Sequence, residues 1–261
     1  MFLQSSLGMT QAERRLLLAE LREQIEGIEH GARRRFLTLP FGISPVDRHF
    51  PGGGLALGSL HEVIEVGLAS EHAASAGLFV AGILARLKGP VLWCLKRRDL
   101  FAPALASVGL HPDRVIYAET RREIDILAAM EEGLRHRGLA GVVGEVARLG
   151  LTPSRRLQLT SESSGVTAFV LRRSSNDAER ASAAEPSAAA TRWRVTAAPS
   201  RPLPSPGIGR ARWLVELTRC RGAEANSWLL EACDAKGCLA LPADLADRSH
   251  PQERGRCFAV G

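Results

Sequence analysis

Residues 41–79 carry the strongest chemical signal in the chain, and the chemistry concerned is phosphate binding. Glycines at 52–54 lead into an apolar, strand-like stretch at 60–65. In a nucleotide-binding protein, a phosphate-binding loop GxxxxGK[ST] would follow this strand directly. Its backbone N–H groups surround the phosphates, its lysine contacts the β and γ oxygens, and its hydroxyl binds Mg²⁺. The stretch that does follow, VGLASEHAASAGLF, keeps Gly67 but has no lysine, and Glu71 would repel a phosphate. On spacing alone, the glycines indicate a turn before the first strand.

The elements around this segment alternate between strand and helix. Short apolar runs predict strands at 60–65, 91–95, 114–117, 140–146 and 167–171, with helices near 72–88, 99–108, 121–136 and 152–162. Such runs are typical of a parallel sheet that is buried on both faces. We therefore predict an α/β fold with a doubly wound, mainly parallel sheet and helices on both faces. Three further strands, predicted to be antiparallel, extend the same sheet at 212–220, 227–233 and 237–242.

The chain is predicted to have three parts. Residues 1–38 hold an amphipathic helix and a basic linker, and the helix could pack on a partner or on its own domain. Residues 39–246 form the core, with an excursion at about 174–190 that is rich in Ala and Ser and that we expect to be flexible. Residues 247–261 are expected to form a frayed tail.

The order of motifs resembles the start of a RecA-type core, which implies a RecA-like fold. The motifs are Gly42-Ile43, Asp47, Gly52-Gly53-Gly54-Leu55, Gly58 and the strand that ends at Glu65. The resemblance puts the catalytic glutamate at about Arg97, and the metal-linked Walker B aspartate at Gly144 with Glu145 as a one-residue alternative. Phosphoryl transfer depends on positioning and electrostatic stabilisation. We therefore expect no ATPase activity, no catalytic residues, no bound cofactor and no metal site.

From end to end, the chain resembles the ImuA family, RecA- and SulA-related proteins of bacterial damage-inducible mutagenesis operons. The match covers roughly residues 39–245 and rests on LPFGI, FPGGGLALGSLHEV, TRWRV, RWLVELTRCRG, SWLLEACDAKG and LALP. It implies a non-catalytic accessory or scaffold protein of SOS-inducible translesion DNA synthesis. The implied partners are an ImuB-type Y-family polymerase homologue and an alternative DnaE-type polymerase, with RecA and DNA as further candidates. Two alternatives stay open: a nucleotide-dependent RecA-like recombination mediator with a non-standard phosphate site, and a SulA-like cell-division inhibitor.

Arginines supply the candidate contacts. The formal net charge is +6, and among 34 basic residues only Lys88, Lys96 and Lys236 are lysines. Arginine pairs bidentately with phosphate and carboxylate, although a GC-rich genome would also raise the arginine content. Some of the candidates could lie near the carboxyl edge of the sheet, where α/β proteins bind ligands, or on a solvated face. The candidate DNA or partner contacts are Arg33, Arg34, Arg35, Arg97, Arg98, Arg121 and Arg122.

Composition excludes several classes of protein. With 45% hydrophobic and 24% charged residues, the chain has the composition of a folded soluble protein. No apolar stretch approaches the roughly 18 residues of a membrane span, and the first residues lack the features of a secretory signal. We therefore expect a cytoplasmic protein with no membrane partner. The five cysteines contain no CxxC pair, which favours buried thiols over a metal site.

Overall fold

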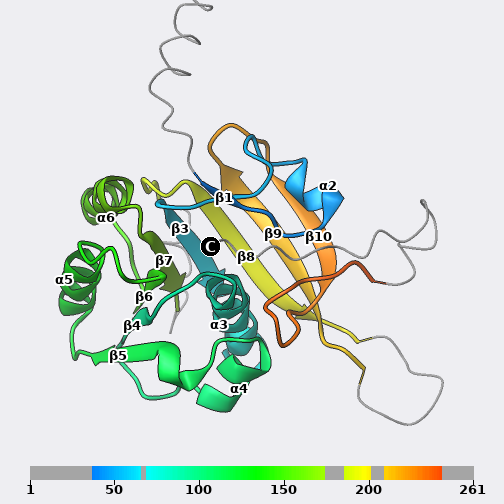
Figure 1. Ribbon diagram of the computed structural model, residues 1–261, viewed down its shortest axis with the longest axis horizontal. Coiled ribbons are helices and arrows are strands. Elements are labelled where there is room, and N and C mark those ends of the chain that lie inside the picture. The colour runs from blue at the N-terminus through cyan, green and yellow to red at the C-terminus, as the bar shows by residue number, and fades with distance from the viewer. Residues whose placement is uncertain (1–36, 66–68, 174–184, 201–208, 243–261) are drawn as a thin grey trace, which may run out of the picture. The chain divides into compact units, whose positions relative to one another are not determined.

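The computed structural model describes residues 37–65, 69–173, 185–200 and 209–242 (Figure 1). All of them belong to the larger of the two units into which the chain divides, residues 37–261. The predicted N-terminal helix, the arginines at 33–35 and the tail at 247–261 lie outside the described residues. Within the described ranges, no helix is both long and apolar enough to cross a bilayer.

A large sheet has the strand order β10-β9-β8-β3-β7-β6-β4-β5. Its strands run parallel from β8 to β5, while β9 pairs antiparallel with both β8 and β10. This arrangement confirms the predicted α/β class and is consistent with a RecA-like fold. The strands are β3 (Leu60–Glu65), β4 (Val91–Leu95), β5 (Val115–Glu119), β6 (Gly141–Val146), β7 (Thr167–Arg172), β8 (Thr191–Ala198), β9 (Arg212–Cys220) and β10 (Asn226–Glu231), beside a small antiparallel pair of β1 (Thr38–Leu39) and β2 (Leu55–Ala56).

Helices cover both faces of the sheet, as predicted (Figure 1). On one face, α3 (Ala69–Ala85) packs on β3, β7 and β8, and α4 (Ala102–Ser107) packs on α3. On the other face, α5 (Glu123–Gly133) packs on β4 and β6, and α6 (Leu151–Ser164) packs on β3 and β7. Because β3, β6 and β7 are covered on both sides, every one of their residues is buried, including His61, Glu62 and Glu65 of β3.

The glycine-rich segment before β3 forms a turn. Asp47, in the short helix α2 (Ser44–Asp47), accepts hydrogen bonds from the backbone N–H groups of Phe41, Gly42 and Ile43 at 2.6, 3.0 and 3.1 Å. Gly58 has a φ of +63°, and a side chain there would meet the backbone of residue 165. The motif therefore fixes the approach of the chain to β3.

Two segments differ from their sequence-based descriptions. Residues 237–242 make an isolated bridge between Ala240 and Glu231 where a strand was predicted. The reason is the turn before it, where the Asp234 carboxylate accepts the N–H groups of Lys236 and Cys238. Residues 185–190 are the last part of the predicted flexible excursion, and they pack against the rest of the protein, since Ser187 is only 3% exposed. The preceding residues 174–184 lie outside the described residues.

Candidate functional site

Four charged side chains meet in a pocket at the carboxyl ends of β3, β6 and β7. Glu65 is the last residue of β3, Glu145 lies near the end of β6, Asp99 follows β4, and Arg173 directly follows β7. The pocket has a volume of about 280 Å³, and α3 and α4 supply its apolar wall. Open α/β sheets bind their ligands at this edge, so the pocket is the candidate site by position.

The Arg173 guanidinium contacts all three carboxylates. It pairs bidentately with Asp99, at 2.9 and 3.0 Å, and donates to Glu145 Oε2 at 2.7 Å. Its Nε lies 3.3 Å from Glu65 Oε2. The side chains of Glu65 and Glu145 are 7% and 6% exposed, whereas Asp99 is 41% exposed. One positive charge therefore faces three negative charges, two of which are buried.

This excess of negative charge affects the pKa values of Glu65 and Arg173. Burial raises the pKa of Glu65 above its ordinary value, and the nearby Arg173 opposes that rise without cancelling it. Burial alone would lower the pKa of Arg173, but hydrogen bonds and charge contacts with Asp99 and Glu145 raise it above its usual range. Arg173 is therefore a permanent cation that partly neutralises an acidic pocket.

Glu145 is the acidic residue that β6 directs into the pocket. Its Oε1 accepts a hydrogen bond from Trp93 Nε1 at 2.8 Å, which fixes the carboxylate beside Arg173. Gly144 faces the opposite side of the sheet, because a Cβ there would lie 2.1 Å from Met130 Sδ on α5. Of the two positions that the resemblance offered, Glu145 is the one that lines the pocket.

Sequence reasoning missed Asp99 and Arg173. Arg97, at the position aligned with a catalytic glutamate, does not line the pocket, whereas Asp99 does. The sequence did contain one signal for Arg173, the pair Arg172-Arg173 at the end of a buried strand. Consecutive side chains of a strand point to opposite faces, so one arginine of such a pair lies on each face of the sheet. Gly67 lies outside the described residues, and the side chain of Glu71 is not described.

The predicted arginines of β4 and β5 come together at one corner of the sheet. Arg97 and Arg98 follow β4, and Arg121 and Arg122 follow β5, which is the neighbouring parallel strand. All four are exposed. Arg98 pairs with Glu119, and Arg122 pairs with Asp125 at 2.8 Å, whereas Arg97 and Arg121 have no ion pair among the described residues.

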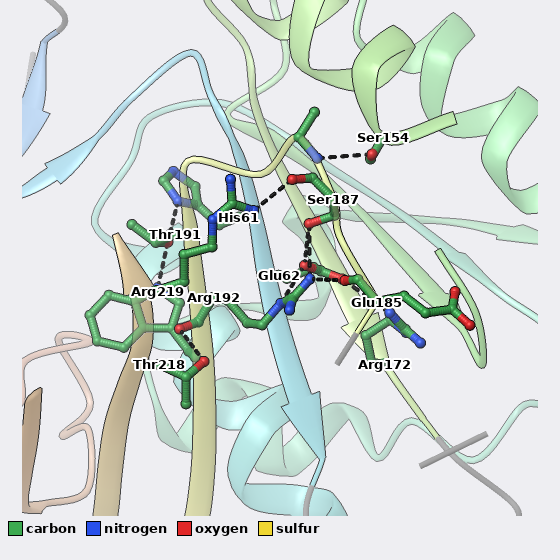
Figure 2. Close-up of polar contacts among 12 residues, drawn as sticks. His61, Glu62, Ser154, Arg172, Glu185, Ser187, Thr191, Arg192, Thr218 and Arg219 are labelled. Carbon is green, nitrogen blue, oxygen red and sulfur yellow. Dashed lines mark hydrogen bonds and ion pairs between the residues drawn. The ribbon is translucent and has the colours of Figure 1, made fainter. Parts of the chain in front are cut away.

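A second charged cluster is buried on the opposite face of the sheet (Figure 2). Glu62 on β3 pairs with Arg172 of β7 at 3.1 Å and with Arg192 of β8 at 2.8 Å. Ser187 donates to the same carboxylate at 2.6 Å. Glu62 and Arg172 have no exposed side-chain surface, so no ligand reaches them. This cluster joins the three central strands and anchors the chain before β8.

His61 and Glu62 point to opposite faces of β3, as adjacent residues of a strand do. His61 bonds to Thr191 Oγ1 at 2.7 Å and to the Ala56 carbonyl at 2.8 Å. Burial lowers the pKa of His61 to about 4, so its imidazole is neutral at physiological pH. The pair is structural.

The cysteines show no metal chemistry within the described part of the chain. Cys94 and Cys233 are buried free thiols, as predicted, but the prediction is wrong for Cys220, a partly exposed thiol, and for Cys238, which is disulfide-bonded. Burial raises the pKa of Cys94 and of Cys233 to about 12, so both are protonated. Among the described residues, no group of His, Cys, Asp or Glu is arranged to hold a metal ion.

Comparison with known proteins identifies the family. Over 216 residues the chain is 39% identical to Protein ImuA of Caulobacter vibrioides, in two strains, and the alignment covers 80% of this chain and 88% of the relative. The chain belongs to the ImuA family. No family model matches this ImuA-family protein.

Proposed function

We propose that this ImuA-family protein is a non-catalytic accessory or scaffold protein of SOS-inducible translesion DNA synthesis. It acts with an ImuB-type Y-family polymerase homologue and an alternative DnaE-type polymerase in the cytoplasm, with RecA and DNA as further partners. Membership of the ImuA family supports this role. The N-terminal segment, residues 1–38, is proposed as the element that binds the ImuB-type partner.

The Arg173 cluster is the observation that carries the non-catalytic part of the proposal. Glu65, Asp99 and Glu145 surround the guanidinium at the edge of the sheet where a RecA-like protein would hold nucleotide phosphates. Three carboxylates against one arginine leave this pocket negative, so a triphosphate would be repelled. The sequence after β3 also lacks the lysine and hydroxyl of a phosphate loop.

Isothermal titration calorimetry with ATP and Mg²⁺ tests whether the pocket excludes nucleotide, with a known RecA-fold ATPase as the positive control. We expect no saturable heat from the wild-type protein. Saturable binding that is lost in Glu145→Gln would instead favour the nucleotide-dependent recombination mediator. The specific observation behind that second candidate is the carboxylate of Glu145, which faces the pocket next to the segment where a phosphate loop would lie.

Partner binding is tested separately. Residues 37–261, which lack residues 1–36 of the proposed segment but keep Thr38 of β1, and the full chain are each co-expressed with tagged ImuB-type and DnaE-type proteins encoded in the same genome. We expect the full chain to bind the ImuB-type protein and the truncated chain to lose that binding while its circular dichroism spectrum stays folded. Unchanged binding by the truncated chain would contradict the proposed role of the N-terminal segment. Binding of a division-ring protein in place of the polymerases would favour the SulA-like alternative.

Arg97 and Arg121 are proposed to contact DNA phosphates or an acidic partner surface, because neither is paired within the described residues. Replacing both with alanine should weaken binding of a fluorescent single-stranded oligonucleotide and lower the salt dependence of that binding. The matched control is the double variant Arg98→Ala and Arg122→Ala, which removes arginines already paired with Glu119 and Asp125. Equal effects of the two double variants would contradict the assignment.

A further inference from the structure

The pocket around Arg173 contains more negative charge than its own cation neutralises. Glu65, Asp99 and Glu145 line it together with Arg173, so three carboxylates face one guanidinium. No other arginine or lysine lines the pocket within the described part of the chain. A ligand that complements the charge of this pocket is therefore a cation.

Glu65 is the carboxylate with the fewest hydrogen-bond donors. Both oxygens of Asp99 and both oxygens of Glu145 accept hydrogen bonds, from Arg173 or from Trp93. Glu65 is only 7% exposed; Arg173 Nε lies 3.3 Å from its Oε2, and its Oε1 accepts no hydrogen bond from any described residue. This Oε1 atom is not fully enclosed by protein, so it touches the open space of the pocket. It is a buried acceptor that faces the cavity without a donor.

The remaining lining of the pocket is apolar. Ala76, Leu105 and Leu171 are buried in its wall, and Phe101 lines it with 68% of its surface exposed. The volume of about 280 Å³ is at the small end of ligand pockets, which span about 300–1,000 Å³. Arginine and lysine side chains fit such a lining, because each carries a charged head on an apolar stem. An exposed aromatic ring also attracts a cation.

We propose that the pocket binds an arginine or lysine side chain that belongs to a protein partner. The apolar stem of that side chain would lie along the wall formed by α3 and α4, beside Phe101, and its charged head would donate to Glu65 Oε1. Charge complementarity selects this occupant, since the same carboxylates repel nucleic acid phosphates and acidic peptides. A metal ion would also be a cation, but no group of His, Cys, Asp or Glu among the described residues is arranged to hold one.

A titration with butylguanidinium, which reproduces the end of an arginine side chain, tests whether the pocket binds a cation. Uncharged butylurea, of similar shape, is the control compound. Indole N–H signals of the ¹⁵N-labelled full-length protein are followed by NMR, because Trp93 Nε1 donates to Glu145 in the pocket, and Trp93→Phe assigns the signal. We expect a saturable shift of the Trp93 signal with butylguanidinium and none with butylurea. No shift with butylguanidinium, or equal shifts with both compounds, would overturn the proposal.

Substitutions locate the binding site. Glu65→Gln keeps the shape of the side chain and removes its charge, so it should raise the dissociation constant of butylguanidinium about tenfold or more. Asp99→Asn should act in the same direction at a side chain that is 41% exposed, where the fold does not depend on it. The matched control is Glu132→Gln on α5, outside the pocket, where Glu132 pairs with Arg135. A dissociation constant that neither pocket variant changes would overturn the proposal.

Partner binding identifies the source of the cation, and here the proposal rests on the proposed function. In the co-expression assay, Glu65→Gln should weaken binding of the partner protein, and excess butylguanidinium should release that protein while butylurea does not. If butylguanidinium binds but neither treatment affects the partner, the pocket takes a free cation such as a polyamine, and the proposed protein source is overturned. If the full chain binds no partner, the proposed function fails, while the titration still decides whether the pocket binds a cation.

Discussion

Replacing Arg173 with methionine is expected to destabilise the protein in a pH-dependent way. Methionine keeps most of the length and apolar surface of the side chain but removes the one cation that, among the described residues, contacts Glu65, Asp99 and Glu145 in the pocket. The free energy of unfolding should therefore change mainly through charge, and the structure allows its size to be worked out.

The contribution of each carboxylate depends on its exposure. Asp99 is 41% exposed, so its pair with Arg173 is close to a surface ion pair worth about 0–1 kcal/mol. Glu65 and Glu145 are less than a tenth exposed, and breaking a fully buried pair costs about 3–5 kcal/mol. Since Arg173 itself is 31% exposed and water reaches it, we expect a total loss of about 2–4 kcal/mol near neutral pH.

The sign of the pH dependence follows from the carboxylates. Without Arg173, the charge that opposes the effect of burial is gone, so the folded-state pKa of Glu65 rises further above that of the unfolded chain. The folded state then binds more protons than the unfolded state between the two pKa values, so stability falls as pH rises through that window. The loss caused by Arg173→Met should therefore be clearly larger at about pH 8 than at about pH 5.

Urea unfolding of the wild type and the variant at both pH values measures this difference. Arg97→Met is the matched control, because Arg97 is exposed without an ion pair in the described part of the chain, and it should change stability by less than about 0.5 kcal/mol. Equal losses for Arg173→Met at the two pH values would refute the electrostatic reasoning. A loss no greater than that of the control would refute the estimate from burial.

Three further outcomes are expected. Arg172→Met should cost about 3–5 kcal/mol in urea unfolding, because it leaves Glu62 buried with one cation fewer; a cost below that of Arg173→Met would contradict the buried character of this pair. In NMR titrations, the His61 imidazole should stay neutral down to about pH 5. Because its folded pKa is lowered to about 4 from 6.5, its contribution to stability is complete above 6.5 and is lost as pH falls towards 4. Trp93→Phe should cost about 1–3 kcal/mol in thermal or urea unfolding, since Glu145 Oε1 loses its donor, and no loss would show that water replaces it.

The main strands were predictable because the sheet is covered on both faces. Strands buried from both sides are mostly apolar, so β4 and β6 stand out as short runs between polar segments, whereas β3 keeps His61, Glu62 and Glu65 among its six buried residues. The segment at 237–242 has the same composition but is not a strand. Its preceding turn is closed by Asp234, a local hydrogen-bonding effect that apolar composition does not reveal.

The candidate site was less predictable than the fold. The sequence indicated that a phosphate loop is missing, and it offered Glu145 only as an alternative to Gly144. It did not indicate that Arg173 would fill the pocket, because Asp99 and Arg173 are far apart in the chain and meet only when β4, β6 and β7 are in register. Pairings that depend on register across non-adjacent segments leave no local pattern to read.

The buried triad of Glu62, Arg172 and Arg192 also affects the rate at which the protein unfolds. Its three members come from β3, β7 and β8, which are brought together by long chain crossovers and are therefore expected to meet late in folding. Interactions that form after the transition state act mainly on the rate of unfolding. The triad would then slow unfolding and prolong the lifetime of the native sheet, while leaving the rate of folding nearly unchanged.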